Sequence, residues 1–285
     1  MREPEDLEMA AAGGVTLAGR LFSPAGPARG AVLLAPAMGV AQTWYEPLGS
    51  WLAGKGFLAL TFDLRGIGRS RRRPLKEERA DLLTWAGDMG TAFAALAERA
   101  RGLPLTWVGH SLGGQLLPFA AGSERAARVV TVASGSGYWR ENAPELRRKV
   151  WLLWWVAVPV STALLGWYPG RALRMVGDLP AGAMRQWRRW CLHPEYAVGA
   201  EGERARAAYA AVRTPITSIS FADDEYMSAR NIGALHEQYT GAPRRMLRFA
   251  PADLKVKRVG HFGFFLPRHA PLWEELLLPE LAHVG

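Results

Sequence analysis

The chain has 285 residues, of which 49% are hydrophobic, and this suits one large α/β domain or a core with an inserted subdomain. The formal net charge is +9, yet no zinc-finger, basic-zipper or RNA-binding pattern accompanies the arginines, so we expect no nucleic-acid partner. A single cysteine, Cys191, excludes an intramolecular disulfide framework and favours a reducing, cytoplasmic compartment, and the acidic N-terminal residues do not resemble a signal peptide.

The first half of the chain alternates between strand patterns and helix patterns. Strands are predicted at 7–11, Val15–Phe22, Gly30–Ala35, Phe57–Phe62, 105–108 and 128–133. Helices are predicted near 44–53, 80–99 and 115–121. Several of the strand segments are continuous apolar runs, which are typical of strands buried on both faces. The alternation therefore predicts a parallel sheet covered by helices.

This alternation stops after Ser134 and resumes near residue 212. The intervening segment is rich in tryptophan and arginine, has helical patches and shows no convincing strand. Afterwards, strands are predicted at Ile216–Phe221 and 245–249, and helices at 228–239 and 271–281. We therefore predict a core made of residues 1–134 and 212–285, with residues 135–211 inserted as a helical cap.

A stretch without charged residues runs from Val150 to Trp167, between basic residues at 147–149 and Arg171. By length it could cross a membrane, but Pro159 in its middle favours two shorter helices. A single span would also separate catalytic groups that lie before it from partners that lie after it. We therefore expect a cap that is either soluble or in contact with a membrane surface, its basic flanks then facing anionic lipid, rather than a membrane span.

The motif Gly109-His-Ser-Leu-Gly113 has the form Gly-x-Ser-x-Gly and lies between a predicted strand and a predicted helix. Such an abrupt turn strains its middle residue and exposes that side chain. The glycines two positions to either side remove side chains that would collide there. Ser111 is therefore a candidate nucleophile, with the amide of Leu112 pointing into the same space; an ordinary glycine-rich turn is the alternative.

A serine hydroxyl needs a base to accept its proton, and the base needs an acid to orient it. In a strand–turn–helix nucleophile fold the chain order is serine, acid, histidine. His261 is the candidate base, because Gly260 and Gly263 allow a tight loop around it and apolar neighbours would fix its ring. The histidines with less suitable settings are His193, His236, His269 and His283, of which His236 is expected on a helix surface.

The acid is expected where the strand Ile216–Phe221 ends, and three carboxylates follow there. Adjacent carboxylates are costly unless at least one has a positive partner, such as an imidazolium. We assign Asp224 as the acid and keep Asp223 as the alternative. Asp223 and Glu225 otherwise fit a solvated acidic turn.

These motifs, together with Asp63-Leu-Arg-Gly-Ile-Gly-Arg-Ser70, resemble the α/β-hydrolase superfamily. Leu34-Ala-Pro-Ala-Met-Gly39 and Gly135-Ser-Gly-Tyr-Trp139 are similar, more narrowly, to a bacterial subgroup of predicted hydrolases related to serine aminopeptidases and monoacylglycerol lipases. The resemblance implies an eight-stranded, mostly parallel sheet flanked by helices, with a helical cap after the sixth strand.

The resemblance also implies an oxyanion hole formed by the backbone amides of Leu112 and Met38. Pro36-Ala37 stands where the family usually carries His-Gly, a departure that affects the loop shape but not the amide donor. A second departure is Pro118, which predicts that the helix after Ser111 is short or bent.

The sequence thus predicts a serine hydrolase that cleaves a small-molecule carboxylic ester through an acyl-enzyme, without a cofactor or metal. Acyl transfer, an amidase or peptidase reaction, and a catalytically silent binding protein remain alternatives, because neither the triad nor the fold chooses among them. We expect an apolar acyl group in the substrate. The tryptophans that either line an acyl groove or pack inside the cap are Trp151, Trp154, Trp155 and Trp167.

Overall fold

The computed structural model describes residues 2–173 and 175–282. Its main sheet has eight strands in the order β1-β2-β4-β3-β5-β6-β9-β10. β1 (Glu5–Ala11) pairs with β2 (Val15–Phe22), and β2 with β4 (Phe57–Phe62), in antiparallel fashion. All other neighbouring strands pair in parallel, from β4 onward. The strands that join β4 in this parallel part are β3 (Gly30–Ala35), β5 (Leu105–His110), β6 (Arg128–Val132), β9 (Ile216–Phe221) and β10 (Arg244–Phe249). The predicted α/β-hydrolase fold is confirmed.

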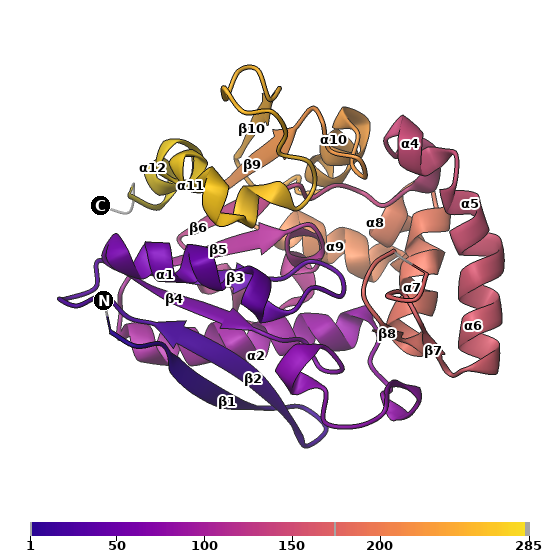
Figure 1. Cartoon of the computed structure of the whole chain (residues 1–285), viewed down its shortest axis with the longest axis horizontal. Helices are drawn as coiled ribbons and strands as arrows, with labels where there is room; N and C mark the ends of the chain where they lie inside the picture. The colour runs from indigo at the N-terminus through magenta and orange to yellow at the C-terminus, as the bar shows by residue number, and fades with distance from the viewer. Residues whose placement is uncertain (1, 174, 283–285) are drawn as a thin grey trace.

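Helices cover both faces of this sheet (Figure 1). On one face α1 (Glu46–Gly54) packs beside the C-terminal helical segment, and the Trp51 and Trp273 rings meet edge to face at 5.7 Å between centroids. On the other face α2 (Leu82–Ala100) places Phe93 against Trp107 of β5. The remaining core helices are α10 (Ala229–Glu237), α11 (Ala270–Leu272), a π-helical turn at Trp273–Leu277 and α12 (Leu278–Ala282). Burial on both faces explains why the central strands are continuous apolar runs.

Most of the predicted core elements are present, and four strand predictions agree with the structure residue for residue: Val15–Phe22, Gly30–Ala35, Phe57–Phe62 and Ile216–Phe221. The helix predicted at 115–121 is wrong. Its place is taken by a single short turn of helix, α3 (Leu112–Gln115), followed by a 3₁₀ turn at Leu117–Phe119. Pro118 has no amide hydrogen with which to continue the helix, so the shortening expected from this residue is confirmed.

The Asp63 motif after β4 stabilises the turn that leaves the sheet. The Asp63 carboxylate accepts hydrogen bonds from the amides of Gln42 (2.8 Å) and Arg69 (2.8 Å). Ser70 Oγ donates to the Asp63 carbonyl and accepts from the Ala18 amide on β2. The motif therefore joins the end of β4 to the middle of β2 and to the segment at Gln42, which makes it a structural feature of the fold.

Between β6 and β9 the chain leaves the sheet and is mainly helical. Its elements are α4 (Pro144–Arg147), α5 (Val150–Leu152), a π-helical turn (Leu153–Ala157), α6 (Val158–Leu164), β7 (Trp167–Tyr168), β8 (Leu179–Pro180), α7 (Ala181–Leu192), α8 (Tyr196–Glu201) and α9 (Glu203–Ala211). The expectation that it contains no strand is wrong in one detail, because β7 and β8 pair as a small antiparallel sheet. Figure 1 shows α4 to α7 grouped at one end of the molecule.

The charge-free stretch forms one continuous helical run from Val150 to Leu164 rather than two separate helices. The π-helical turn directly precedes Pro159 and accommodates the missing amide hydrogen, as such turns commonly do inside helices. Across residues 2–173 and 175–282, no helix combines the length and apolar character that a bilayer crossing requires.

Candidate active site

Ser111 occupies the sharp turn between β5 and α3, with φ 48° and ψ −107°. Few non-glycine residues adopt such a backbone, and this strain is typical of a nucleophile elbow. A side-chain carbon on Gly109 would lie 2.6 Å from the Gly113 carbonyl carbon, and one on Gly113 would lie 2.2 Å from the Ala35 carbonyl oxygen. The two glycines of the motif are therefore required by close backbone contacts.

Tyrosine hydroxyls stabilise the shortened helix behind Ser111. The Gly114 carbonyl would normally accept from residue 118, which is a proline, and it accepts from Tyr239 OH instead. Tyr209 OH donates to the Gln115 carbonyl at 2.8 Å. The Tyr239 hydroxyl, from the segment after α10, thus replaces the hydrogen bond that Pro118 removes, and Tyr209 on α9 pairs the next carbonyl.

The parallel strands end at one edge of the sheet, and the loops after β9 and β10 meet there. His261 Nδ1 lies 2.8 Å from Asp224 Oδ2, and both side chains are buried. The other oxygen, Asp224 Oδ1, accepts from the amides of Tyr226 and Met227, each at 2.8 Å. The carboxylate is therefore held by three hydrogen bonds, and only one of its oxygens faces the imidazole.

Asp223 and Glu225 do not form the solvated turn that the sequence suggested. Asp223 Oδ2 accepts from the amides of Val259 (2.8 Å) and Gly260 (3.1 Å), and Glu225 Oε2 accepts from the amide of His261 (3.1 Å). All three neighbouring carboxylates thus bind the loop that carries His261. The sequence could not reveal this, because the contacts join segments more than 30 residues apart.

The residue before Ser111 contacts His261. His110 Nε2 lies 3.0 Å from the His261 carbonyl oxygen, and the centroids of the two rings are 5.3 Å apart. Within the described part of the chain, no hydrogen bond joins Ser111 Oγ to the His261 ring. Such bonds are often long before substrate binds.

One of the two expected amide donors lies in a loop and the other at the start of a helix. Met38 follows β3, and Leu112 is the first residue of α3, where an amide has no partner within its own helix. Among the described residues, neither the Met38 amide nor the Leu112 amide donates to another protein group. Both remain available to an oxygen atom of a substrate.

The other histidines have structural contacts. The expectation that His236 lies on a helix surface is wrong, because its buried ring contacts Thr131 Oγ1 (2.8 Å) and the Ile232 carbonyl (2.7 Å). Burial lowers the pKa of His236 to about 4. His269 is also buried and lies 2.6 Å from the Gly263 carbonyl. His283 lies outside the described residues.

An apolar groove of about 470 Å³ lies beside the site, within the size range of small-molecule pockets. Its apolar lining residues are Leu146, Leu152, Leu153, Ala157, Leu173, Met175 and Tyr226. Tyr226 connects the groove to the site, because its ring centroid is 4.9 Å from that of His261.

The tryptophans considered for an acyl groove lie elsewhere. Trp154 is buried and packs edge to face against Trp187, with centroids 5.1 Å apart, and Trp155 packs on Trp139 at 5.2 Å. Trp151 is about half exposed (48%). The groove lining is mainly aliphatic with three charged side chains among it, and it contains none of these tryptophans, which the sequence pattern of the helix did not reveal.

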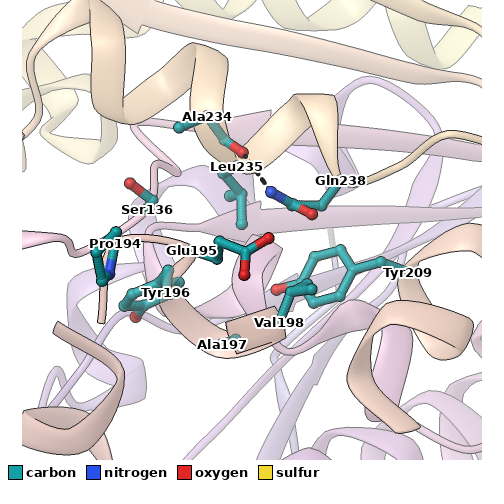
Figure 2. A pocket seen from close by; sticks show the side chains of 10 residues that line it. All are labelled: Ser136, Pro194, Glu195, Tyr196, Ala197, Val198, Tyr209, Ala234, Leu235 and Gln238. Atoms are coloured by element: carbon teal, nitrogen blue, oxygen red, sulfur yellow. Dashed lines mark hydrogen bonds between the residues drawn. The ribbon is translucent and has the colours of Figure 1, made fainter. Parts of the chain in front are cut away.

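A second pocket, drawn in Figure 2, lies between α8 and α10 and is lined by Ser136, Tyr196, Tyr209 and Leu235, among others. Its volume of about 20 Å³ has room for about one water molecule. It does not include Ser111, Asp224 or His261, and its size excludes an ester substrate.

Comparison with protein-family models gives a match to the family described as serine aminopeptidase, S33, over residues 26–188. The matched part is more than half of the chain. It contains Met38 and Ser111 and ends before Asp224 and His261. Comparison with curated proteins finds no match.

Solved structures share the fold over most of their length. A soluble variant of monoglyceride lipase from Saccharomyces cerevisiae, in complex with a substrate analogue, has a TM-score of 0.64 and 17% identity, covering 88% of this chain and 86% of that one. A thermostable carboxyl esterase from Bacillus coagulans has a TM-score of 0.61 and 14% identity, covering 88% and 91%. A hydrolase from Pseudomonas aeruginosa PA01 has a TM-score of 0.60 and 18% identity, covering 99% and 100%.

Proposed function

Because the chain belongs to the serine aminopeptidase S33 family and has the α/β-hydrolase fold, we propose that it is a serine hydrolase that cleaves a carboxylic ester through a covalent acyl-enzyme. The observation that carries this proposal is the 2.8 Å contact between His261 Nδ1 and Asp224 Oδ2, beside the strained turn at Ser111. Ser111 is the nucleophile, His261 the general base and Asp224 the group that orients it.

In the first half of the reaction, Ser111 Oγ attacks the ester carbonyl carbon while His261 Nε2 accepts its proton. The carbonyl oxygen becomes an oxyanion and accepts hydrogen bonds from the amides of Met38 and Leu112. His261 then gives its proton to the leaving alcohol as the carbon–oxygen bond breaks. Asp224 stabilises the transient imidazolium through Nδ1–H.

In the second half, water takes the place of the alcohol. His261 accepts a proton from the water as its oxygen attacks the acyl-enzyme, and the same two amides bind the second oxyanion. The proton returns to Ser111 Oγ when the acyl bond breaks, and the carboxylic acid leaves. The direct test is turnover of p-nitrophenyl esters with analysis of both products; release of neither product would contradict the proposal.

We further propose that residues 135–211 act as a cap and that the groove between this cap and Tyr226 holds the acyl chain. Most of the groove lining is aliphatic, although Glu145, Lys149 and Glu225 also line it. Burial of each methylene group against the aliphatic part contributes about 0.8 kcal/mol. A groove that opens near His261 favours substrates with a medium or long apolar acyl group. A short-chain esterase would have no use for this surface.

The acyl groove predicts that kcat/KM rises from acetyl to octanoyl p-nitrophenyl esters. Ala157→Trp places a large side chain at the groove wall and should flatten this rise while leaving acetyl ester turnover little changed. Ala163→Trp is the matched control, because Ala163 is exposed on the same helical run outside the groove. A flat wild-type profile, or the same loss in both variants, would contradict the assignment.

The outer face of the same helical run supports a peripheral membrane contact. Eight of the ten exposed large hydrophobic side chains in the described chain lie between Trp151 and Leu173. Two of these, Leu152 and Leu173, also line the groove. Leu164 is the most exposed, at 79%. The exposed basic residues 147–149 lie at one end of this face, where they complement an anionic lipid surface. We propose that the face rests on a membrane that contains anionic lipid.

Membrane contact predicts that the protein sediments with vesicles containing about 30% phosphatidylserine more than with pure phosphatidylcholine, and less at high salt. Leu164→Glu should weaken this binding about tenfold or more, since it removes an apolar group and adds a like charge. Met246→Glu is the control, because Met246 is exposed on β10. Equal vesicle binding by the two variants would contradict the membrane contact. If the wild-type protein formed a dimer and Leu164→Glu abolished it, the exposed face would instead bind a second copy of the chain.

A further inference from the structure

Two buried side chains outside the proposed triad link its parts. Tyr45, at the start of α1, accepts a hydrogen bond from the Ala37 amide at 2.9 Å through its hydroxyl. The same hydroxyl lies 2.8 Å from His110 Nδ1, and His110 Nε2 lies 3.0 Å from the His261 carbonyl oxygen. Both Tyr45 and His110 are 1% exposed, so water does not compete for these bonds.

The partners fix where each proton lies. The His261 carbonyl can only accept, so His110 Nε2 must carry the hydrogen. Burial lowers the pKa of His110 well below its usual value, and His261 nearby lowers it further, so the ring has a single N–H. His110 Nδ1 is then an acceptor, and the Tyr45 O–H donates to it. One directed series of bonds therefore runs from the Ala37 amide through Tyr45 and His110 to the His261 backbone.

Three members of this series lie next to, or belong to, residues used in the proposed reaction. Ala37 precedes Met38, whose amide is a proposed oxyanion donor, and His110 precedes Ser111. The third contact is the backbone of His261 itself. The loop after β3, the end of β5 and the loop after β10 are thus joined by hydrogen bonds next to the groups used in the proposed reaction.

We infer that Tyr45 and His110 are positioning residues that fix the oxyanion loop, the nucleophile and the base relative to one another. This inference rests on the proposed function for its kinetic consequence, but not for its geometry. Neither side chain exchanges a proton with the substrate. They keep the oxyanion loop, the nucleophile and the base at fixed relative positions. Displacement of a catalytic group by about 1 Å can lower the rate about a hundredfold.

The test is Tyr45→Phe, which keeps the ring packed against Phe265 (5.0 Å between centroids) and removes only the hydroxyl. We expect kcat for a soluble short-chain ester to fall about ten- to hundredfold, with KM nearly unchanged, because the substrate-binding surface remains. The rate of labelling by a fluorophosphonate should fall in parallel. A kcat within about twofold of the wild type would overturn the inference.

Thr131→Val is the matched control for a simple loss of stability. Thr131 Oγ1 also lies at 2.8 Å from a nitrogen of a buried histidine, His236, and valine keeps the side-chain shape. Both variants should lose similar thermal stability, but Thr131→Val should keep kcat near the wild-type value. Proportional losses of kcat and stability in the two variants would assign Tyr45 a purely structural role.

A measurement on the unmodified protein covers the case in which Tyr45→Phe does not fold. Imidazole ¹⁵N chemical shifts should place the His110 proton on Nε2 at neutral pH; a proton on Nδ1 would overturn the inference. A wild type without esterase activity or fluorophosphonate labelling would refute the proposed function, whereas equal labelling of wild type and Tyr45→Phe would refute only this inference.

Discussion

Replacing Ser111 by alanine is expected to abolish ester hydrolysis while leaving the fold intact, with a loss in kcat of about 10⁴- to 10⁶-fold. In the proposed mechanism the Ser111 hydroxyl oxygen alone forms the covalent bond to the acyl group, so no neighbouring group can replace it. Its removal should not unfold the protein, since Ser111 Oγ makes no hydrogen bond that supports the turn within the described chain. Alanine also accepts the strained backbone about as well as serine does.

Kinetics of purified Ser111→Ala on p-nitrophenyl butyrate, with circular dichroism as a check of folding, test this prediction. Ser218→Ala is a matched control, because Ser218 Oγ is buried on β9 and has no hydrogen-bond partner among the residues that the structure describes. The control should keep its activity. Retention of more than about a tenth of wild-type kcat by Ser111→Ala would exclude this residue as the nucleophile.

The second large effect is expected at Asp224, where asparagine should lower kcat about 10⁴-fold. In Asp224→Asn the side-chain oxygen would still accept from the amides of Tyr226 and Met227. The new NH₂ group would then face His261 Nδ1 and donate to it. His261 would have to carry its proton on Nε2, the nitrogen that must accept from Ser111, so the base would be in the wrong tautomer.

Asp223→Asn serves as the comparison for Asp224→Asn. Its oxygen can still accept from the amides of Val259 and Gly260. Its new NH₂ group would take the place of Asp223 Oδ1, which has no hydrogen-bond partner in the described part of the chain. We expect a loss of less than about tenfold. If steady-state kinetics showed the reverse order for the two variants, the acid of the site would be Asp223.

The sequence specified those parts of the fold that depend on local pattern. Strands such as Phe57–Phe62 have an apolar residue at nearly every position, because both faces of the sheet are covered, and their bounds were predicted correctly. The helix after Ser111 was misplaced because its sequence is apolar, whereas Pro118 prevents its continuation. The short β7–β8 pair was missed because two residues per strand leave no periodic signal.

The candidate site could be assembled from motifs only where each residue has a characteristic neighbourhood. Ser111 lies between glycines that the turn requires, and His261 lies in a glycine-containing loop. The role of Tyr45 could not be predicted in this way, because a tyrosine at the start of an amphipathic helix is usually an ordinary core residue. Its partners are at positions 37 and 110, and only the three-dimensional structure brings them together.

The central claim, that Ser111 is the nucleophile of an acyl-enzyme mechanism, is tested most directly by labelling with a fluorophosphonate followed by peptide mass spectrometry. The reagent phosphonylates an activated serine, whereas an ordinary serine hydroxyl reacts poorly. Labelling therefore shows that the serine is activated. We predict a single adduct on the peptide that contains Ser111, and its loss in Ser111→Ala and His261→Ala. An adduct on another residue, or an unlabelled wild-type protein, would contradict the account.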